Sequence, residues 1–466
     1  MSKPTRRTGQ RTKPGQGQSA DEIRAREMAN VPGLAARVAA ARVIADVLTG
    51  PHALDERFSP SAVPSRVAGL DIRDTALARS IATVALRRLG TIRHALAALL
   101  EKGLPRQAGQ LEWLLIVAAA QILFLDVPDH AAVDLAVRES RLDAKTAPFA
   151  ALINGVLRNL ARRREEFLSA SDPLDQDTPA WLAARWRKHY GQETAHAIAA
   201  AHREEPRLDL SVKSDPQGWA ERLGGMLLPT GSVRLRSHEP VAELPGYSDG
   251  EWWVQDAAAA LPVRLLAPRA GERVLDLCAA PGGKTAQIAT AGAQVTALDR
   301  SAERLRRLTE NLERLHLHAE VIVADAMSYS GGPFDAILLD APCTSTGTIR
   351  RHPDVAWTKR PGDIETLTAL QTRMLDRAAT LLAPGGRLVY CSCSLEPEEG
   401  EAHVPALLRR NPDLRLAPIT EEDPIPAEFV TSDGTLRTLP NAWPHDEPRL
   451  AGLDGFFAAR FQRVVG

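Results

Sequence analysis

Apolar residues in the first third of the chain recur at intervals of three and four, which is the spacing of amphipathic helices. The pattern runs from about residue 32 to residue 168 and is broken near Gly50-Pro51, Pro60 to Pro64, Pro105 and Pro128. We therefore predict an all-α domain of several helices over residues 32–168. The clearest apolar run consists of Phe149, Leu152, Ile153, Val156, Leu157 and Leu160.

The pattern changes between residues 172 and 250. Apolar residues from Trp181 to Ile198 mark a pair of helices, and the residues from Leu208 to Val212 alternate like a strand. Gly-Gly and Pro-Gly pairs then punctuate short segments up to Gly250. This stretch predicts a small α+β connecting module over residues 172–250.

Over residues 251–466 the pattern alternates between strands and helices, which is typical of an α/β, Rossmann-like domain. Gln255-Asp256 opens a helix, and further helices are expected at Ala302 to Leu315 and at Glu365 to Leu382, the latter ended by Pro384-Gly385-Gly386. Edge strands are expected at Thr435 to Leu439 and Phe456 to Phe461. The predicted core strands are Val274 to Leu277, Val295 to Leu298, Glu320 to Val323, Ala336 to Leu339 and Arg387 to Tyr390.

Charge adds one feature to this picture, because a net charge of −1 over 466 residues hides a basic start. Five basic residues precede the first acidic one, so residues 1–31 are expected to form a disordered tail that either contacts RNA phosphates or aids solubility. No apolar run there resembles a secretory signal, and Leu111 to Leu125 is too short to cross a bilayer. We expect a cytoplasmic protein. Arginines that could present a basic helix face, or merely a solvated one, are Arg87, Arg88, Arg93, Arg158, Arg162, Arg163 and Arg164.

The stretch VLDLCAAPGGKT, Val274 to Thr285, runs a strand through a turn of small residues into a helix. Ligands bind outside the carboxyl ends of such strands. The glycines fit neither the Walker phosphate loop, since Cys278 stands where that loop needs glycine, nor G-x-G-x-x-G. A strand with Asp276 near its end and an acidic residue, Asp299, closing the next strand is typical of a methyl-donor site. An ordinary strand-to-helix turn is the alternative.

Chemically useful side chains cluster at the ends of the predicted strands. All four cysteines fall in this region, a distribution that argues against a secreted disulfide scaffold. They could form a redox pair, a zinc site that includes His352, or a covalent catalyst, but Cys391-x-Cys393 is one residue shorter than a zinc C-x-x-C pair. The residues at or just past the strand ends are Asp276, Asp299, Asp325, Asp340, Cys343 and Cys393, and the two other cysteines are Cys278 and Cys391.

A thiolate beside a methyl donor points to methylation of cytosine at C5. That carbon is a poor nucleophile until a thiolate adds to C6, with a carboxyl group such as Asp340 assisting at N3 and the exocyclic amine. A second cysteine, Cys343, can help release the product. The base must be single-stranded or flipped out, with Arg350 and Arg351 expected to hold its backbone. The residues alone leave open whether Cys391 or Cys393 is the nucleophile.

Three motifs together resemble the Nol/Nop/Sun (Nsun) family of RNA cytosine-C5 methyltransferases. They are VLDLCAAPGGKT, DAPCTSTGTIRRHPDVAW (Asp340 to Trp357) and LVYCSCSLEPEEGE (Leu388 to Glu401). The stretch PFAALINGVLRNLARR (Pro148 to Arg163) resembles the NusB helical domain, and this resemblance implies that the domain docks RNA or protein. Together with the three motifs, it makes the chain similar to the bacterial Sun (Fmu) type, which acts on 16S ribosomal RNA.

The resemblance assigns roles to named residues. It implies that Cys393 is the nucleophile and that Cys343 assists product release. Ser392 stands where the family commonly has threonine, and Cys391 is an additional thiol. The resemblance also implies that S-adenosylmethionine is contacted by Cys278, Ala279, Ala280, Pro281, Gly282, Gly283, Lys284, Asp299, Asp325 and Asp340.

Several alternatives remain. The chain could be an RNA-binding or antitermination factor with an inactive catalytic domain, a DNA methyltransferase that uses Cys343, or a transfer RNA methyltransferase. Lys284 could only cap its helix, and His352 could contact RNA or only shape its loop. Glu396, Glu398 and Glu399 resemble a metal cluster, but we interpret them as first-turn acids that favour a helix dipole. The expected partner is RNA, either naked or partly assembled into a particle. We expect the protein to be a monomer and to bind neither DNA nor a membrane.

Overall fold

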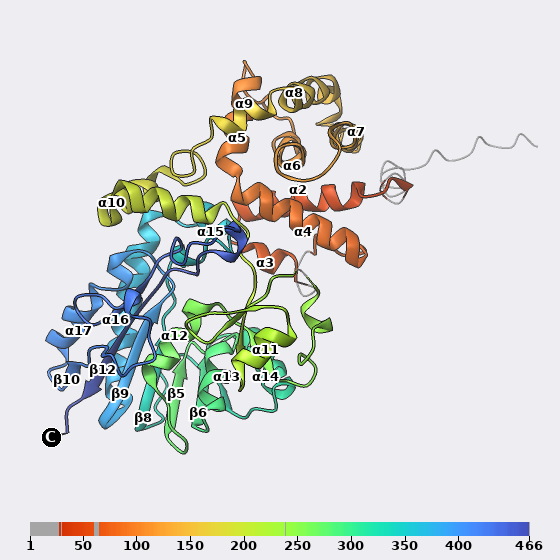
Figure 1. Ribbon diagram of the computed structural model, residues 1–466. Helices are drawn as coiled ribbons and strands as arrows, with labels where there is room; N and C mark the ends of the chain where they lie inside the picture. Colours follow the sequence, from red (N-terminus) through yellow and green to blue (C-terminus); the bar gives the residue numbers. More distant parts are fainter. Residues whose placement is uncertain (1–27, 29, 60–64, 238, 466) are drawn as a thin grey trace, which may run out of the picture. The chain divides into compact units, whose positions relative to one another are not determined.

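A computed structural model describes residues 28, 30–59, 65–237 and 239–465 (Figure 1). Nearly all of the predicted basic tail lies outside these residues. The chain forms two compact units. The first comprises the described parts of residues 1–45, 55–82 and 95–164, and the second comprises residues 46–54, 83–94 and 165–466.

The first unit is helical throughout its described residues, as the three-and-four periodicity predicts. Its centre is α6, where eleven residues are buried, and α7 and α8 pack against it. No helix in the described chain is both long and apolar enough to span a membrane. The helices that contribute to this unit are α2 (Leu34–Thr49), α3 (Leu54–Arg57), α4 (Ile72–Arg87), α5 (Leu89–Leu99), α6 (Leu111–Phe124), α7 (Asp129–Ser140) and α8 (Ala150–Arg162).

The second unit begins with helices and a small antiparallel sheet. The predicted helical pair is α10 (Ala180–His202), which is interrupted at Gly191, where φ is 80°. The sheet has the order β2-β3-β1-β4, with a buried ion pair between Arg234 and Asp209 at 2.6 Å. The other elements are α9 (Arg164–Ser169), β1 (Asp209–Val212), α11 (Pro216–Arg222), β2 (Met226–Leu227), β3 (Val233–Arg234) and β4 (Trp252–Val254).

The main sheet has eight strands in the order β10-β12-β9-β8-β5-β6-β7, with β11 paired to β12. The five strands from β9 to β7 are parallel, whereas β12 is antiparallel to β9. These strands are β5 (Arg273–Leu277), β6 (Gln294–Asp299), β7 (Glu320–Val323), β8 (Phe334–Asp340), β9 (Leu382–Ser392), β10 (Leu414–Leu416), β11 (Leu436–Thr438) and β12 (Phe456–Arg463).

Helices cover both faces of this sheet, because alternate side chains of each strand point in opposite directions. Ile337 and Leu339 of β8 pack in the cluster that contains residues of α16, whereas Ala336 and Leu338 pack in the cluster with α12 and α13. Helix α14 packs through its leucines beside α13. The helices are α12 (Ala257–Leu266), α13 (Gly283–Thr290), α14 (Ala302–Arg314), α15 (Asp354–Thr358), α16 (Pro361–Leu381) and α17 (His403–Arg410).

Two sequence-based expectations for this sheet are wrong. The segment at Phe456 was expected to form an edge strand, but β12 lies inside the sheet between β9 and β10. The helix before Pro384-Gly385-Gly386 ends at Leu381, and β9 already begins at Leu382. The short strand β10 covers the β12 edge and was not predicted, because three residues carry too little alternation to be recognised.

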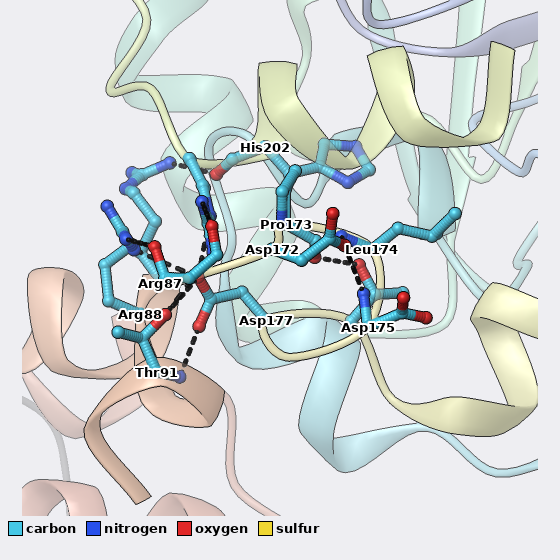
Figure 2. A network of polar contacts seen from close by, with 12 residues as sticks. Arg87, Arg88, Thr91, Asp172, Pro173, Leu174, Asp175, Asp177 and His202 are labelled. Atoms are coloured by element: carbon cyan, nitrogen blue, oxygen red, sulfur yellow. Dashed lines mark hydrogen bonds and ion pairs between the residues drawn. The ribbon is translucent and has the colours of Figure 1, made fainter. Parts of the chain in front are cut away.

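Residues 83–94 pack with the second unit, and a polar network ties them there (Figure 2). The Asp177 carboxylate accepts hydrogen bonds from the Thr91 backbone N–H at 2.7 Å and from the guanidinium groups of Arg88 and Arg203 at 3.0 and 2.7 Å. Arg87 donates to the carbonyl of His202 at 3.2 Å. Arg87 and Arg88 therefore do not present the basic face suggested by the sequence.

Candidate active site

A cavity of about 550 Å³ lies at the carboxyl ends of β5, β6, β7 and β8. Its position is the edge where an α/β sheet binds ligands. Six residues from the predicted strand ends and turns line it, which confirms that they share one edge. These six are Cys278, Asp299, Asp325, Asp340, Cys343 and Cys393. The rest of the lining comprises Ala280, Leu298, Arg300, Arg304, Ala324, Ala326, Met327, Ala341, Pro342, Ser345, Leu370, Arg373 and Met374.

The turn after β5 forms one wall of the cavity. Cys278 has a left-handed backbone with φ 63°, and burial raises the pKa of its thiol, so this cysteine is a neutral part of the wall. Asp299 accepts hydrogen bonds from the backbone N–H groups of Ala280 at 3.3 Å and Ser301 at 2.9 Å. Gly282 has φ 105°, and a Cβ there would stand 2.8 Å from Leu308 Cγ. The turn can hold this shape only with glycine at that position.

Asp276 is the predicted strand-end acid that does not reach the cavity. It is completely buried and accepts a hydrogen bond of 2.6 Å from the Thr285 hydroxyl, which ties β5 to α13. Its Oδ1 atom has no partner among the described residues. Burial raises the pKa of this carboxyl to about 7.

Asp340 and Lys284 form an ion pair on the second wall. The Lys284 Nζ lies 2.8 Å from Asp340 Oδ2 and 5.0 Å from the centre of the Phe456 ring. Burial alone would lower the pKa of the ammonium, but the charge of Asp340, its hydrogen bond and the neighbouring cysteines together outweigh burial, and the pKa is raised. Lys284 therefore acts on this wall through Asp340. Lys284 itself does not line the cavity. The same is true of four other residues that the family resemblance assigns to the cofactor, namely Ala279, Pro281, Gly282 and Gly283.

Two cysteines meet at the cavity from neighbouring strands. Asp340, at the end of β8, pairs in register with Cys391 of β9, so the segments that follow these strands lie side by side. The Sγ atoms of Cys343 and Cys393 are 3.5 Å apart. Either thiol can donate this hydrogen bond. With Cys343 as the donor, the bond lowers the pKa of Cys393, whereas the same bond and burial raise the pKa of Cys343. In this arrangement Cys393 is the better thiolate of the pair.

Cys391 does not line the cavity. It is fully buried within β9, and its thiol donates a 3.5 Å hydrogen bond to Asp340 Oδ1. Burial raises the pKa of this thiol well above its ordinary value. A neutral, inaccessible thiol is a poor nucleophile, so the structure favours Cys393 over Cys391 where the residues alone did not.

The expectation that Arg350 and Arg351 hold an RNA backbone is wrong. Arg350 is 1% exposed and donates to the carbonyl of Ala451 at 2.7 Å. Arg351 donates to the Asp256 carboxylate at 2.6 Å. Both side chains belong to the packing of the loop after Cys343 and not to a surface.

The glutamates after β9 also have more specific partners than a helix dipole. Glu396 and Glu398 form ion pairs with Arg185 of α10. Glu399 is buried and accepts a hydrogen bond from the Thr344 backbone N–H at 3.0 Å. Among the described residues, no group of three or more candidate ligands is arranged to hold a metal ion.

The cavity has residues that the motifs did not identify. Arg300 and Arg304 follow β6, and Leu370, Arg373 and Met374 lie on α16. The position of Arg300, one residue after a strand-end acid, could have been noticed in the sequence. The residues of α16 carried no such signal, because an amphipathic helix looks the same whether it faces a cavity or solvent.

The composition of the cavity fits a nucleoside with a charged tail. Its volume lies within the range of about 300–1,000 Å³ that is usual for small-molecule sites. Asp299 and Asp325 supply acceptors for hydroxyl or amino groups, and Leu298, Ala326 and Met327 supply apolar contact for a flat ring. The residues present are therefore suitable for S-adenosylmethionine.

Comparison with known proteins agrees with this geometry. Residues 263–462 match the model of the family described as 16S rRNA methyltransferase RsmB/F, and residues 34–162 match that of the NusB family. Ribosomal RNA small subunit methyltransferase B of Vibrio cholerae is 38% identical over 82% of this chain and 90% of its own length. The protein of the same name from Xylella fastidiosa is 36% identical over 93% of this chain and 99% of its own.

A solved structure is similar as well. The crystal structure of a methyltransferase homologue from Pyrococcus horikoshii superimposes with a TM-score of 0.50 at 28% identity, and covers 61% of this chain and 95% of its own. The fold and the sequence therefore agree. The chain has a helical first unit and a Rossmann-like sheet with a cavity at the carboxyl ends of its strands, and it is similar in sequence to these relatives over most of its length. The chain belongs to the family of small-subunit ribosomal RNA methyltransferases, which take their methyl group from S-adenosylmethionine.

Proposed function

We propose that this protein methylates C5 of a cytosine in 16S ribosomal RNA through a covalent bond between Cys393 and C6 of the base. The observation that supports this most directly is the pair of cysteine sulfurs, 3.5 Å apart, on the wall of the cavity. Two thiols in contact suit a reaction that must both form and break a carbon–sulfur bond. The family relationship supports the ribosomal substrate.

The residues would act in a fixed order. The Cys393 thiolate bonds to C6, which makes C5 nucleophilic, and Asp340, held by its ion pair with Lys284, contacts the N3 and amine edge of the ring. S-adenosylmethionine supplies an electrophilic methyl group when bound, and Cys278, Asp299 and Asp325 would hold it. After transfer, a water molecule takes the proton from C5, and the electron pair re-forms the C5–C6 double bond as the C6–sulfur bond breaks. The departing Cys393 thiolate would be stabilised by a hydrogen bond from the Cys343 thiol.

The cysteine roles can be separated by single substitutions assayed with a 16S RNA transcript and radiolabelled methyl donor. Cys393→Ala should abolish both methylation and any protein–RNA adduct on a denaturing gel. Cys343→Ala should form the adduct and release it slowly. Cys391→Ala is the matched control, since this buried thiol lies outside the cavity, and it should retain methylation.

If Cys343→Ala alone abolished the adduct, the nucleophile would be Cys343 of the Pro342-Cys343 motif. This is the arrangement of DNA cytosine methyltransferases, and it would contradict the proposed roles. Bisulfite mapping of RNA from cells with and without the gene identifies the substrate. Loss of one protected cytosine in 16S RNA is expected. An unchanged 16S map with a lost transfer RNA cytosine would contradict the proposed substrate.

A further inference from the structure

A single buried carboxylate contacts the segments of both active-site cysteines. Glu399 is 0% exposed and lies in a short turn, Pro397–Glu399, after β9. Its Oε1 accepts from the Thr344 backbone N–H at 3.0 Å, and its Oε2 accepts from the Ser394 hydroxyl at 2.6 Å. Thr344 follows Cys343 in the chain, and Ser394 follows Cys393. One side chain thus holds the residue next to each sulfur.

Further hydrogen bonds brace this arrangement. Gln371 of α16 donates to Glu399 Oε1 at 3.1 Å and to the Pro342 carbonyl at 2.9 Å, and His403 contacts the Gln371 amide oxygen at 2.9 Å. The Glu399 backbone carbonyl accepts from the Ser392 hydroxyl at 2.9 Å. The bracing fixes the residues before and after both cysteines, so the contact of 3.5 Å between the sulfurs is imposed by the fold.

The charge of Glu399 is unusual for its surroundings. The hydrogen-bond donors around its carboxylate are neutral, and no cation within the described residues forms an ion pair with it, whereas Glu396 and Glu398 share Arg185. A buried charge without a counter-ion acts strongly on nearby titratable groups. After the hydrogen bond to Cys393, burial and the charge of Cys393, the Glu399 charge contributes to the raised pKa of Cys343.

We propose that Glu399 is the positioning residue that divides the roles of the two cysteines. It holds Cys343 and Cys393 in contact and keeps the proton on Cys343, so that Cys393 is the thiolate that attacks the base. The inference rests on the proposed function, because it explains which of two adjacent thiols becomes the nucleophile.

The other titratable groups that face the pair do not make this distinction. Asp340 and Lys284 form an ion pair whose charges oppose each other at Cys393. Cys391 and Tyr390 are neutral, because burial raises the pKa of each well above its ordinary value. Apart from Cys393 itself, Glu399 is therefore the group whose charge raises the pKa of Cys343.

Alkylation of the free enzyme tests the proposal without RNA. Iodoacetamide reacts with thiolates, and peptide mass spectrometry gives the labelling ratio of Cys393 to Cys343. Glu399→Gln should lower this ratio about tenfold, since removal of a like charge lowers a neighbouring pKa by about one unit or more. Glu398→Gln is the matched control and should leave the ratio unchanged, because that carboxylate is paired with Arg185.

A structural role alone gives a different result. Ser394→Ala removes one hydrogen bond to Glu399 but keeps the charge, so it should slow methyl transfer without changing the labelling ratio. If Glu399→Gln also slows transfer and leaves the ratio unchanged, the carboxylate only braces the loop and the proposal is wrong.

Wild-type protein provides a second measurement if Glu399→Gln fails to fold. Burial raises the pKa of Glu399, so its charge should be lost at a higher pH than that of an ordinary glutamate, and the preference for Cys393 should fall as the pH is lowered from 8 to 4. A ratio that is constant over this range overturns the proposal. Failure of the proposed function would appear elsewhere, as absence of RNA methylation by wild type, and would leave the labelling result intact.

Discussion

Asp177 offers a direct test of the network that ties residues 83–94 to the second unit (Figure 2). Its side chain is 3% exposed and accepts from the Thr91 backbone N–H, the Thr91 hydroxyl, and the guanidinium groups of Arg88 and Arg203. The substitution Asp177→Ala removes all four contacts at once. It leaves two largely buried guanidinium groups without this carboxylate, and that loss dominates the cost.

The magnitude follows from the burial of the partners. Removing one member of a buried ion pair costs about 3–5 kcal/mol, because the other charge is left uncompensated. Arg88 and Arg203 are 16% and 14% exposed and can still reach some water, so the low end of that range, about 3 kcal/mol, is expected. The unfolding entropy of about 2.1 cal/mol/K per residue corresponds to about 1.5 °C per kcal/mol for a unit of this size, which gives a decrease of about 4–5 °C.

Scanning calorimetry of the full chain measures this decrease. Asp175→Ala is the control from the same loop, because Asp175 is 64% exposed and pairs with Arg187 at the surface, where ion pairs contribute at most about 1 kcal/mol. The Asp177 variant should methylate RNA normally at low temperature, since it does not touch the cysteines. Equal melting temperatures for the two variants would refute the reasoning that burial gives this network its strength.

Three further predictions follow from buried groups. The folded protein holds a proton on Asp276 up to about pH 7, whereas the unfolded chain releases it near pH 4. The free energy of unfolding should therefore fall by about 1.4 kcal/mol per pH unit between these values, and Asp276→Asn should flatten that slope in thermal scans. Gly282→Ala should weaken S-adenosylmethionine binding in calorimetry at least about tenfold, because its Cβ would stand 2.8 Å from Leu308 Cγ at a φ of 105°. Arg351→Gln should lower the melting temperature and leave the RNA affinity of the folded protein unchanged, since the guanidinium is bound to Asp256.

The convergence of the site could be predicted from the sequence because it depends on topology. In a parallel sheet the carboxyl ends of all strands meet at one edge, so a strand-end residue reaches that edge whatever the details of packing. Asp299, Asp340 and Cys393 lie there for this reason. Asp276 shows the limit, since it sits one residue further inside its strand and its side chain turns towards Thr285.

The destinations of the charged side chains could not be predicted in this way. Runs of arginine look alike in the sequence whether they face solvent or a buried carboxylate 90 or more residues away. Arg351 pairs with Asp256 and Arg185 pairs with Glu396, contacts that exist only after the units of secondary structure have packed. Local spacing likewise suggested a helix dipole for Glu399, while its true partners, Thr344 and Ser394, come from two different loops.

The three thiols near the carboxyl end of β9 show how position separates residues that a motif presents as equivalents. Cys391 lies within β9, where pairing to β8 and β12 encloses it and keeps it neutral. Cys393 lies just beyond the strand, where the ladder has ended and the side chain reaches the cavity. Cys343 reaches the same cavity but lies beside the Glu399 charge. In the proposed mechanism, accessibility excludes one thiol and electrostatics distinguishes the other two, so moving the end of β9 by two residues should change the nucleophile even with every motif residue retained.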